Sequence, residues 1–355
     1  MDKNFWQNKR VLITGHTGFK GAWLALRLWQ LGAKVSGLAL PQDNLEAVYH
    51  VTNLKEYLTQ EFFGDVADTH FLQSTLKQHE FDVIFHLAAQ SLVLEGYQDP
   101  LKTYQTNVIG TLNILNVFKM LDVAKVCLIV TSDKCYDNKE NGCPFVEDDQ
   151  LGGKDIYSSS KGCCELLTSA YRHSFFNNGS EKVLATARAG NVIGGGDYAP
   201  NRLIPDCIKS LRKNERIVLR HPNAIRPWQH VIDVITGYII LAEKMWQQAM
   251  HQIEENYGCP WNFAPSKDEA YSVEEVVQQV IKAYGSGSYI TSENNEAPYE
   301  ASCLRLDATK ANSLLKWDTH FSLPEAISLT IDWYKADPKD TLDLTFKQFS
   351  YYDTK

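Results

Sequence analysis

The stretch VLITGHTGFKG, residues 11–21, decides the fold of this chain. Its first four residues form a continuous apolar run, as buried parallel strands do. Apolar residues at helical spacing follow from Leu24 onward, so a helix is expected after the turn. The three glycines between strand and helix let the backbone approach a phosphate, and the helix N-terminus attracts negative charge. The stretch therefore predicts a strand–turn–helix unit that binds a dinucleotide, in preference to a merely structural tight turn.

The alternation of apolar strands and amphipathic helices continues beyond this unit. Strands are predicted at 11–14, 35–40, 81–87, 125–130 and 183–190, and helices at 100–121 and 155–176. Alternating strands and helices form a doubly wound parallel sheet. We therefore expect an α/β fold, a Rossmann-type sheet with a smaller mixed α/β substrate-binding lobe.

The pattern changes at GNVIGGGDYAPNR (190–202), which is rich in Gly, Pro and Asn and reads as a long loop. The second lobe should begin there, and the apolar stretch 231–246 should be a helix that returns to the first lobe. The expected division is a dinucleotide-binding domain at 1–190 and 231–260 and a substrate-binding domain at 191–230 and 261–355. The last fifteen residues give no clear prediction.

Composition excludes several classes of protein. The 355 residues carry a net charge of −8 with no block of Lys or Arg, so neither a nucleic acid nor a membrane is expected as a partner. The eight cysteines include no C-x-x-C pair, which predicts free thiols in a reducing compartment and no metal site. The N-terminus has no apolar signal segment. We expect a cytoplasmic protein.

A chemically active pair lies in the predicted helix 155–176. Tyr157 and Lys161 are four residues apart and share one face of the helix. A nearby ammonium stabilises a phenolate, so the pKa of Tyr157 is expected to fall toward neutrality, which suits a base that takes a proton from an alcohol. Such a pair is common on protein surfaces. However, Thr-Ser-Asp-Lys (131–134) ends another predicted strand, at the edge where ligands bind in such sheets.

These motifs together resemble the extended short-chain dehydrogenase/reductases that modify nucleotide sugars, and within that family the CDP-glucose 4,6-dehydratases. The resemblance covers nearly the whole chain. The segments that carry it are TGHTGFKG (14–21), HLAAQ (86–90), TNVIGT (106–111), TSDKCY (131–136), YSSSK (157–161), RAGNVIGGGD (188–197) and RPWQHV (226–231).

The resemblance implies a three-step reaction with NAD as the cofactor. Hydride leaves C4 of the glucose, water is lost across C5 and C6, and the hydride returns to C6 to give a 4-keto-6-deoxy sugar. By the same resemblance, Tyr157 is the base at O4 and Ser132 hydrogen-bonds O4. Lys161 holds the cofactor ribose and lowers the pKa of Tyr157, and Asp133 protonates the departing C6 hydroxyl.

Lys134 departs from the family pattern, since related dTDP- and GDP-sugar dehydratases typically have a glutamate there as the C5 base. A lysine acts as a base only when it is neutral, so its pKa would have to fall from about 10.4. Lys134 is expected to remove the C5 proton. The alternatives are that it stays charged and stabilises the enolate, or that it points to solvent.

The cofactor is expected to be NAD rather than NADP, because no arginine follows the second strand to bind a 2′-phosphate. The acid usual for the ribose is also missing, and Asp43 is the nearest one. Asp65 could bind the adenine amine or cap the following helix, and Lys20 is given no role. The expected cofactor contacts are Gly15, Thr17, Gly18, Phe19, Gly21, Asp65, Val66, Leu87, Ala88, Ala89, Asn107, Tyr157 and Lys161.

The second lobe should hold the CDP end of the substrate, CDP-glucose. By resemblance, Asn191 and Arg226 contact the diphosphate, Arg202 lies near the same phosphates, and Glu300 reaches the nucleotide ribose. The loop 91–95 lacks the arginine expected there. The expected substrate contacts are Gln90, Asn191, Arg202, Leu203, Arg226 and Glu300.

Three alternatives stay open from the sequence: a 4-epimerase of the same fold, a 4,6-dehydratase of another nucleotide-hexose, and a non-catalytic NAD-binding redox sensor. The helices 100–121 and 155–176 also carry more apolar residues than one core face needs, such as Val117, Leu121, Leu166 and Leu167. The equivalent helices of the family pair across a dimer, so a homodimer or higher homo-oligomer is expected.

Overall fold

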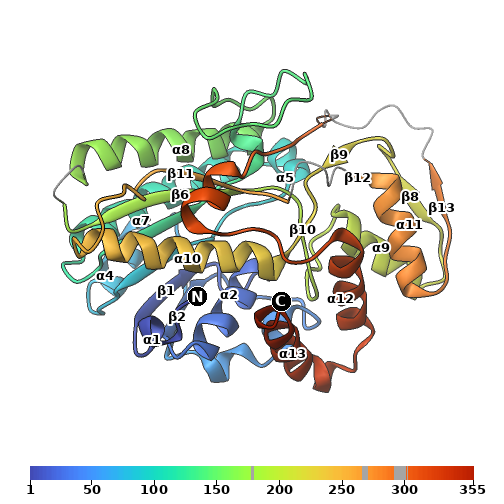
Figure 1. Ribbon diagram of the computed structural model, residues 1–355, viewed down its shortest axis with the longest axis horizontal. Coiled ribbons are helices and arrows are strands. Elements are labelled where there is room, and N and C mark those ends of the chain that lie inside the picture. Colours follow the sequence, from blue (N-terminus) through green and yellow to red (C-terminus); the bar gives the residue numbers. More distant parts are fainter. Residues whose placement is uncertain (177–179, 266–270, 292–300, 302) are drawn as a thin grey trace.

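The computed structural model describes residues 1–176, 180–265, 271–291, 301 and 303–355, and shows a large lobe beside a smaller one (Figure 1). Within these residues the main sheet has seven parallel strands in the order β11-β6-β5-β4-β1-β2-β3. The strands are β1 (Arg10–Thr14), β2 (Lys34–Ala39), β3 (Gln60–Phe63), β4 (Val83–His86), β5 (Val126–Val130), β6 (Val183–Ala189) and β11 (Pro260–Phe263). The strand order reverses between β1 and β4, where ligands bind in doubly wound sheets. The predicted fold class is confirmed.

Helices cover both faces of this sheet (Figure 1). One face is covered by α2 (Phe19–Gln30) and α10 (Val231–Ala249), and the other by α4 (Thr69–Leu76), α7 (Gly110–Met120) and α8 (Ile156–Phe175). Successive strand side chains point to opposite faces. Ile13 therefore belongs to the apolar core under α2 and α10, and its neighbour Leu12 to the core under α4, α7 and α8.

The remaining elements build the smaller lobe and the connections. The other helices are α1 (Lys3–Trp6), α3 (Val48–Val51), α5 (Val93–Gln98), α6 (Pro100–Tyr104), α9 (Leu203–Arg212), α11 (Val273–Tyr284), α12 (Leu323–Lys335) and α13 (Thr341–Asp353). Short strands are β7 (Val192–Ile193), β8 (Ile217–Leu219), β9 (Ile225–Arg226), β10 (Gln229–His230), β12 (Tyr271–Ser272) and β13 (Tyr289–Thr291). Short helical turns are η1 (Leu54–Tyr57), η2 (Gln105–Ile109), η3 (Asp133–Cys135), η4 (Ala311–Leu315) and η5 (Pro338–Asp340). In Figure 1 the smaller lobe contains α9, α11, β8 and β13.

The predicted strands and helices are confirmed, with local differences. All five predicted strands lie in the main sheet, and the helix expected at 231–246 is α10, which packs against β5 and β6. The helix expected at 100–121 is divided by η2, a wide turn between α6 and α7. The sequence did not predict β11. This strand crosses the domain boundary that was expected at residue 260. The division into two domains stays a prediction.

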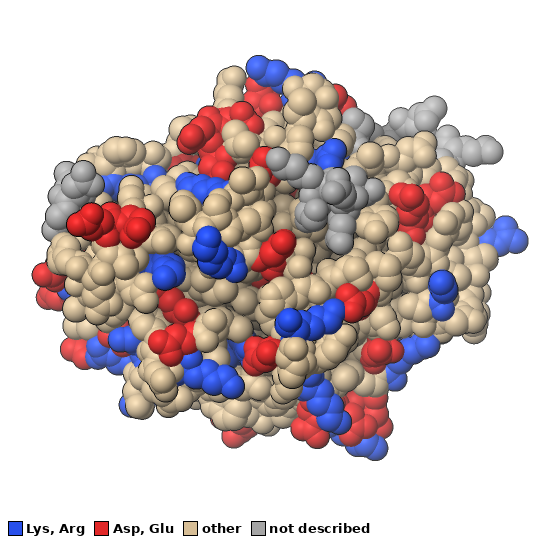
Figure 2. All heavy atoms as spheres, viewed as in Figure 1, with Lys and Arg blue, Asp and Glu red and all other residues tan. Residues whose placement is uncertain are grey.

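The C-terminal residues, which gave no prediction, form α13 and pack back onto the large lobe. Arg27 of α2 pairs with Asp353, and the rings of Trp23 and Phe349 meet edge to face with centroids 5.5 Å apart. No helix in the described part of the chain combines the length and the apolarity that crossing a bilayer requires. On the face in Figure 2, basic and acidic side chains are interspersed.

Candidate active site

A cleft of about 1250 Å³ lies at the carboxyl edge of the main sheet and is lined by both lobes. Sites for a single small molecule usually measure roughly 300–1,000 Å³. The cleft therefore has room for two ligands of nucleotide size. One end is formed by the glycine turn after β1, and the other by β8 and the start of α11.

The turn after β1 requires its glycines. Gly15 has φ +77°, and a Cβ on it would lie 2.8 Å from the backbone nitrogen of Ala88. A Cβ on Gly21 would lie 2.1 Å from the carbonyl oxygen of Gly15. Thr17 Oγ1 donates to the carbonyl oxygen of Leu40 at 3.0 Å, which ties the turn to the end of β2. The tight, side-chain-free backbone at the N-terminus of α2 fits a pyrophosphate.

Among the described residues that line the cleft just after β2 and β3, none is an arginine or a lysine. Asp43 and Asp65 both line the cleft there. Asp65 Oδ1 accepts a hydrogen bond from the backbone of Ala67 at 2.9 Å, whereas Asp68 caps α4, so the alternative that Asp65 caps this helix is wrong. The carboxylates at this end suit ribose hydroxyls and oppose a 2′-phosphate.

The predicted catalytic residues come together at the ends of β5 and α8. Ser132 caps η3, and its Oγ donates to Asp133 Oδ1 at 2.9 Å and accepts from the backbone nitrogen of Lys134 at 3.2 Å. Tyr157 and Lys161 lie one turn apart on α8, 7% and 5% exposed. All five residues line the cleft. Two separate elements thus present an acid, an amine and a phenol to one space.

Burial sets the protonation of this group. It raises the pKa of Asp133, against the opposing effects of Lys134 and the Ser132 hydrogen bond. A carboxyl with a raised pKa can donate a proton near neutrality. Burial also raises the pKa of Tyr157 to about 12, although hydrogen bonding with Ser132 lowers it. The expected fall of the Tyr157 pKa toward neutrality is therefore wrong for the chain without ligands.

Lys161 also links α8 to the end of β5. Its Nζ donates to the carbonyl oxygen of Val130, at the end of β5, at 3.3 Å. Burial lowers the pKa of Lys161. The ammonium therefore joins α8 to the strand that precedes the Ser132 segment, in addition to any contact it makes with a ligand.

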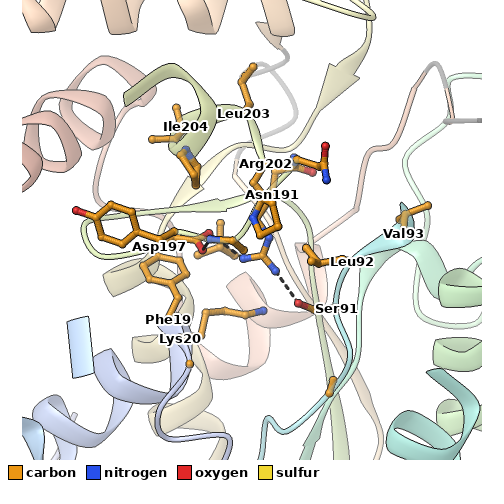
Figure 3. A pocket seen from close by; sticks show the side chains of 18 of the residues that line it. Phe19, Lys20, Ser91, Leu92, Val93, Asn191, Asp197, Arg202, Leu203 and Ile204 are labelled. Atoms are coloured by element: carbon orange, nitrogen blue, oxygen red, sulfur yellow. Dashed lines mark hydrogen bonds and ion pairs between the residues drawn. The ribbon is translucent and has the colours of Figure 1, made fainter. Parts of the chain in front are cut away.

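Lys20 was given no role from the sequence, but it points into the cleft (Figure 3). Burial, followed by the nearby charges of Arg202 and Lys161, lowers the pKa of Lys20 to about 8. The available signal was its position between Gly18 and Gly21, in the first turn of the helix after β1. Residues there face whatever the turn binds.

Arg202 crosses the cleft from the smaller lobe. Its Nη1 pairs with Asp197 Oδ2 at 2.8 Å, and its Nη2 donates to Ser91 Oγ at 2.8 Å (Figure 3). The loop 91–95 lacks the expected arginine, and the guanidinium of Arg202, the N-cap residue of α9, contacts this loop instead. Asn191, Leu203 and Arg226 also line this part of the cleft, as expected for substrate contacts.

Two predicted contacts lie behind the cleft wall. Asn107 is 1% exposed; its Oδ1 accepts from the backbone of Gln90 at 2.8 Å, and its Nδ2 donates to Ser160 Oγ at 2.8 Å. Gln90 Nε2 donates to Thr103 Oγ1 at 2.8 Å. Asn107 holds the loop after β4 against α8, Gln90 holds it against α6, and neither residue is part of the lining. Glu300, the predicted ribose contact, lies outside the described residues.

Comparisons with known proteins identify the family of this chain. A family model described as GDP-mannose 4,6 dehydratase matches residues 12–330. CDP-glucose 4,6-dehydratase of Salmonella typhimurium is 41% identical over 340 residues, which cover 95% of this chain and 93% of the relative.

Solved structures share the fold at lower identity. The dTDP-glucose 4,6-dehydratase of Bacillus anthracis, in complex with NAD, is 21% identical with a TM-score of 0.75 and covers 92% of this chain and 96% of its own. A UDP-glucose 4-epimerase of Thermus thermophilus, also complexed with NAD, is 20% identical with a TM-score of 0.77, covering 92% and 99%. The expected resemblance is confirmed: the chain belongs to the GDP-mannose 4,6-dehydratase family, within the extended short-chain dehydrogenase/reductases.

Proposed function

We propose that this chain is an NAD-dependent CDP-glucose 4,6-dehydratase, which converts CDP-D-glucose to CDP-4-keto-6-deoxy-D-glucose. The observation that carries the proposal is the Ser132–Asp133–Lys134 segment facing Tyr157 and Lys161 across one cleft. An epimerase needs no acid at C6, so the buried Asp133 favours a dehydratase. The 41% identity to the Salmonella CDP-glucose 4,6-dehydratase supports the choice of nucleotide.

The glycine turn, Asp43 and Asp65 fit NAD, which when bound takes a hydride from C4 and returns it to C6. Tyr157 accepts the proton of the O4 hydroxyl, while Ser132 hydrogen-bonds O4. Burial is the main cause of the raised pKa of Tyr157, which is about 12 even with the charge of Arg202 nearby, so the proton transfer depends on further positive charge. Arg202 is the cation of this chain that lowers the pKa of the phenol, and Lys161, one turn further along α8, lines the same cleft.

The elimination belongs to the segment after β5. The 4-ketone makes the C5 proton acidic, and Lys134 removes it or stabilises the resulting enolate. Asp133, whose pKa is raised by burial, donates a proton to the departing C6 hydroxyl. C5 and C6 are neighbouring carbons of the sugar. The adjacent residues Lys134 and Asp133 can therefore act on them together, one at the C5 proton and the other at the C6 hydroxyl.

The other end of the cleft holds the nucleotide. Arg226, 3% exposed, and Arg202 supply guanidinium groups for the diphosphate, and Asn191 adds an amide. The expected contact of Glu300 with the nucleotide ribose remains part of the proposal.

The active form is a homodimer or a larger homo-oligomer built through α6 and α8. Leu101 and Leu166 on these packed helices are 67% and 61% exposed. Val117 and Leu121, also expected at a subunit contact, are instead 2% and 7% exposed and belong to the internal core. A cytoplasmic location is part of the proposal, since all eight cysteines are free thiols.

The proposal is tested by turnover of CDP-glucose with added NAD⁺, beside dTDP-, UDP- and GDP-hexoses. A 4-keto-6-deoxy product, detected by its absorbance in alkali, is expected from CDP-glucose alone. Product from another nucleotide would keep the mechanism and remove the CDP assignment. Accumulation of NADH without product would indicate a plain dehydrogenase.

A further inference from the structure

A buried ion pair lies directly behind the catalytic segment. Arg188 Nη2 of β6 and Glu165 Oε2 of α8 are 2.8 Å apart, and their side chains are 2% and 1% exposed. Neither residue lines the cleft, and the mechanism above uses neither. A buried ion pair contributes little to stability by itself, because desolvation offsets its attraction. The pair must be explained by what it holds.

Glu165 holds the start of the catalytic segment. Thr131 Oγ1 donates to Glu165 Oε1, and Thr186 Oγ1 donates to Glu165 Oε2 at 2.8 Å. Thr131 directly precedes Ser132. Although burial opposes ionisation of Glu165, the charge of Arg188 and these hydrogen bonds hold its pKa below the usual value. The carboxylate therefore fixes the end of β5 to α8.

Arg188 holds the other end of the same segment. Its Nη1 donates to the hydroxyl of Tyr136 at 2.6 Å, and its guanidinium lies 4.8 Å from the centre of that ring. The Tyr136 hydroxyl in turn donates to Asn262 Oδ1 of β11 at 2.7 Å. One ion pair thus binds the segment at Thr131 and at Tyr136, with Ser132, Asp133 and Lys134 between them.

Glu165 lies on the same face of α8 as the catalytic residues Tyr157 and Lys161. Tyr157, Lys161 and Glu165 follow one another at four-residue spacing, so they share one face of the helix. The reaction needs Tyr157 at O4 while Asp133 and Lys134 reach C5 and C6 of the same sugar. These groups come from two elements, and a misplacement of about 1 Å can cost about a hundredfold in rate.

We propose that the Glu165–Arg188 pair is a positioning device, which holds the Thr131–Tyr136 segment at its working distance from Tyr157 and Lys161 on α8. The inference rests on the proposed function for its kinetic consequences. It goes beyond that function because it gives a role in catalysis to two residues that do not line the cleft. Their role is to keep the groups for oxidation and the groups for elimination in register.

The test cuts each link and leaves the ion pair intact. Tyr136→Phe removes the hydrogen bond from Arg188, and Thr131→Val removes the one to Glu165. We expect kcat to fall by about ten- to a hundredfold with KM for CDP-glucose nearly unchanged, and NADH to accumulate during turnover because elimination lags behind oxidation. Glu181→Gln, which breaks the exposed Lys125–Glu181 pair, is the control and should match the native enzyme.

A second readout needs no substrate and separates this inference from the proposed function. Amide hydrogen exchange of residues 131–136 in the free enzyme should be about tenfold faster in both variants, with β1 and β2 unchanged. Native exchange in this segment would overturn the positioning role, and so would a native kcat without NADH accumulation. If the native protein makes no product from CDP-glucose, the substrate assignment fails while the exchange comparison still decides the role of the pair.

Discussion

Ser132 Oγ donates a 2.9 Å hydrogen bond to Asp133 Oδ1, so two neighbouring residues with different tasks are linked directly. In the proposed mechanism Ser132 hydrogen-bonds O4 of the sugar, whereas Asp133 protonates the departing C6 hydroxyl. The bond stabilises the ionised carboxylate, yet burial outweighs it and raises the pKa of Asp133. Burial therefore favours the protonated form of this acid.

We predict that Asp133→Asn abolishes elimination and leaves oxidation at C4. The amide keeps the acceptor for Ser132 but cannot donate a proton to the leaving hydroxyl, so kcat for product should fall by about 10² to 10⁴. Because this acid is lost as pH rises through its raised pKa, native kcat should fall on the alkaline side. NADH absorbance and product formation, followed from pH 6 to pH 10, check both expectations. Product formation at the native rate would remove Asp133 from the mechanism.

Lys134 gives a second prediction, which concerns C5. Lys134→Ala should lose exchange of the C5 proton with D₂O, because no other base has been assigned there, and Lys134→Glu should restore part of it. Mass spectrometry of recovered CDP-glucose and product measures the exchange. Retained exchange in the alanine variant would show that Lys134 stabilises the enolate or has no role at C5.

The sequence predicted those parts of the site that depend on local pattern. The glycine turn and the 131–134 segment follow apolar runs, and buried parallel strands are continuously apolar. β11 escaped prediction because Pro260-Trp261-Asn262-Phe263 is short and mixed, and it becomes a strand only by pairing with β6. Asn107 belongs to a motif of the family, but its hydrogen bonds to Gln90 and Ser160 hold its side chain outside the cleft lining.

Protonation was the property least accessible from sequence. The i, i+4 spacing of Tyr157 and Lys161 predicted a lowered tyrosine pKa, but the depth of the cleft sets the opposite direction. Lys20 was given no role from the sequence, because only the fold brings the charges of Arg202 and Lys161 close enough to lower its pKa. Burial and long-range charge arise from the tertiary structure, so no local pattern carries them.

A third prediction concerns the subunit contact. Leu166→Asp places a charge on the exposed side of α8 and should convert the oligomer to a monomer of about the 40.2 kDa chain mass. Size-exclusion chromatography with light scattering measures it. Leu314→Asp is the matched control, since Leu314 is 47% exposed but lies in η4, away from α6 and α8. A native protein that is already monomeric would contradict the assembly.

A fourth prediction concerns stability and pH. Asp233 of α10 is fully buried, its Oδ1 accepts from the backbone of His320 at 2.7 Å, and burial raises its pKa to about 7. Because the folded pKa lies above the unfolded one, its contribution to stability is fully present below about pH 4 and is lost as pH rises to about 7. Three pKa units correspond to about 4 kcal/mol.

Asp233→Asn keeps an acceptor for His320 and cannot ionise, so it should remove this loss. We expect its thermal midpoint to exceed the native one by several degrees at pH 8 and to match it near pH 4. Asp332→Asn, an exposed carboxyl on α12, is the control and should change neither value. Calorimetry at the two pH values measures the difference. Equal gains at both would mean that packing, rather than ionisation of the buried carboxyl, limits the stability of this part of α10.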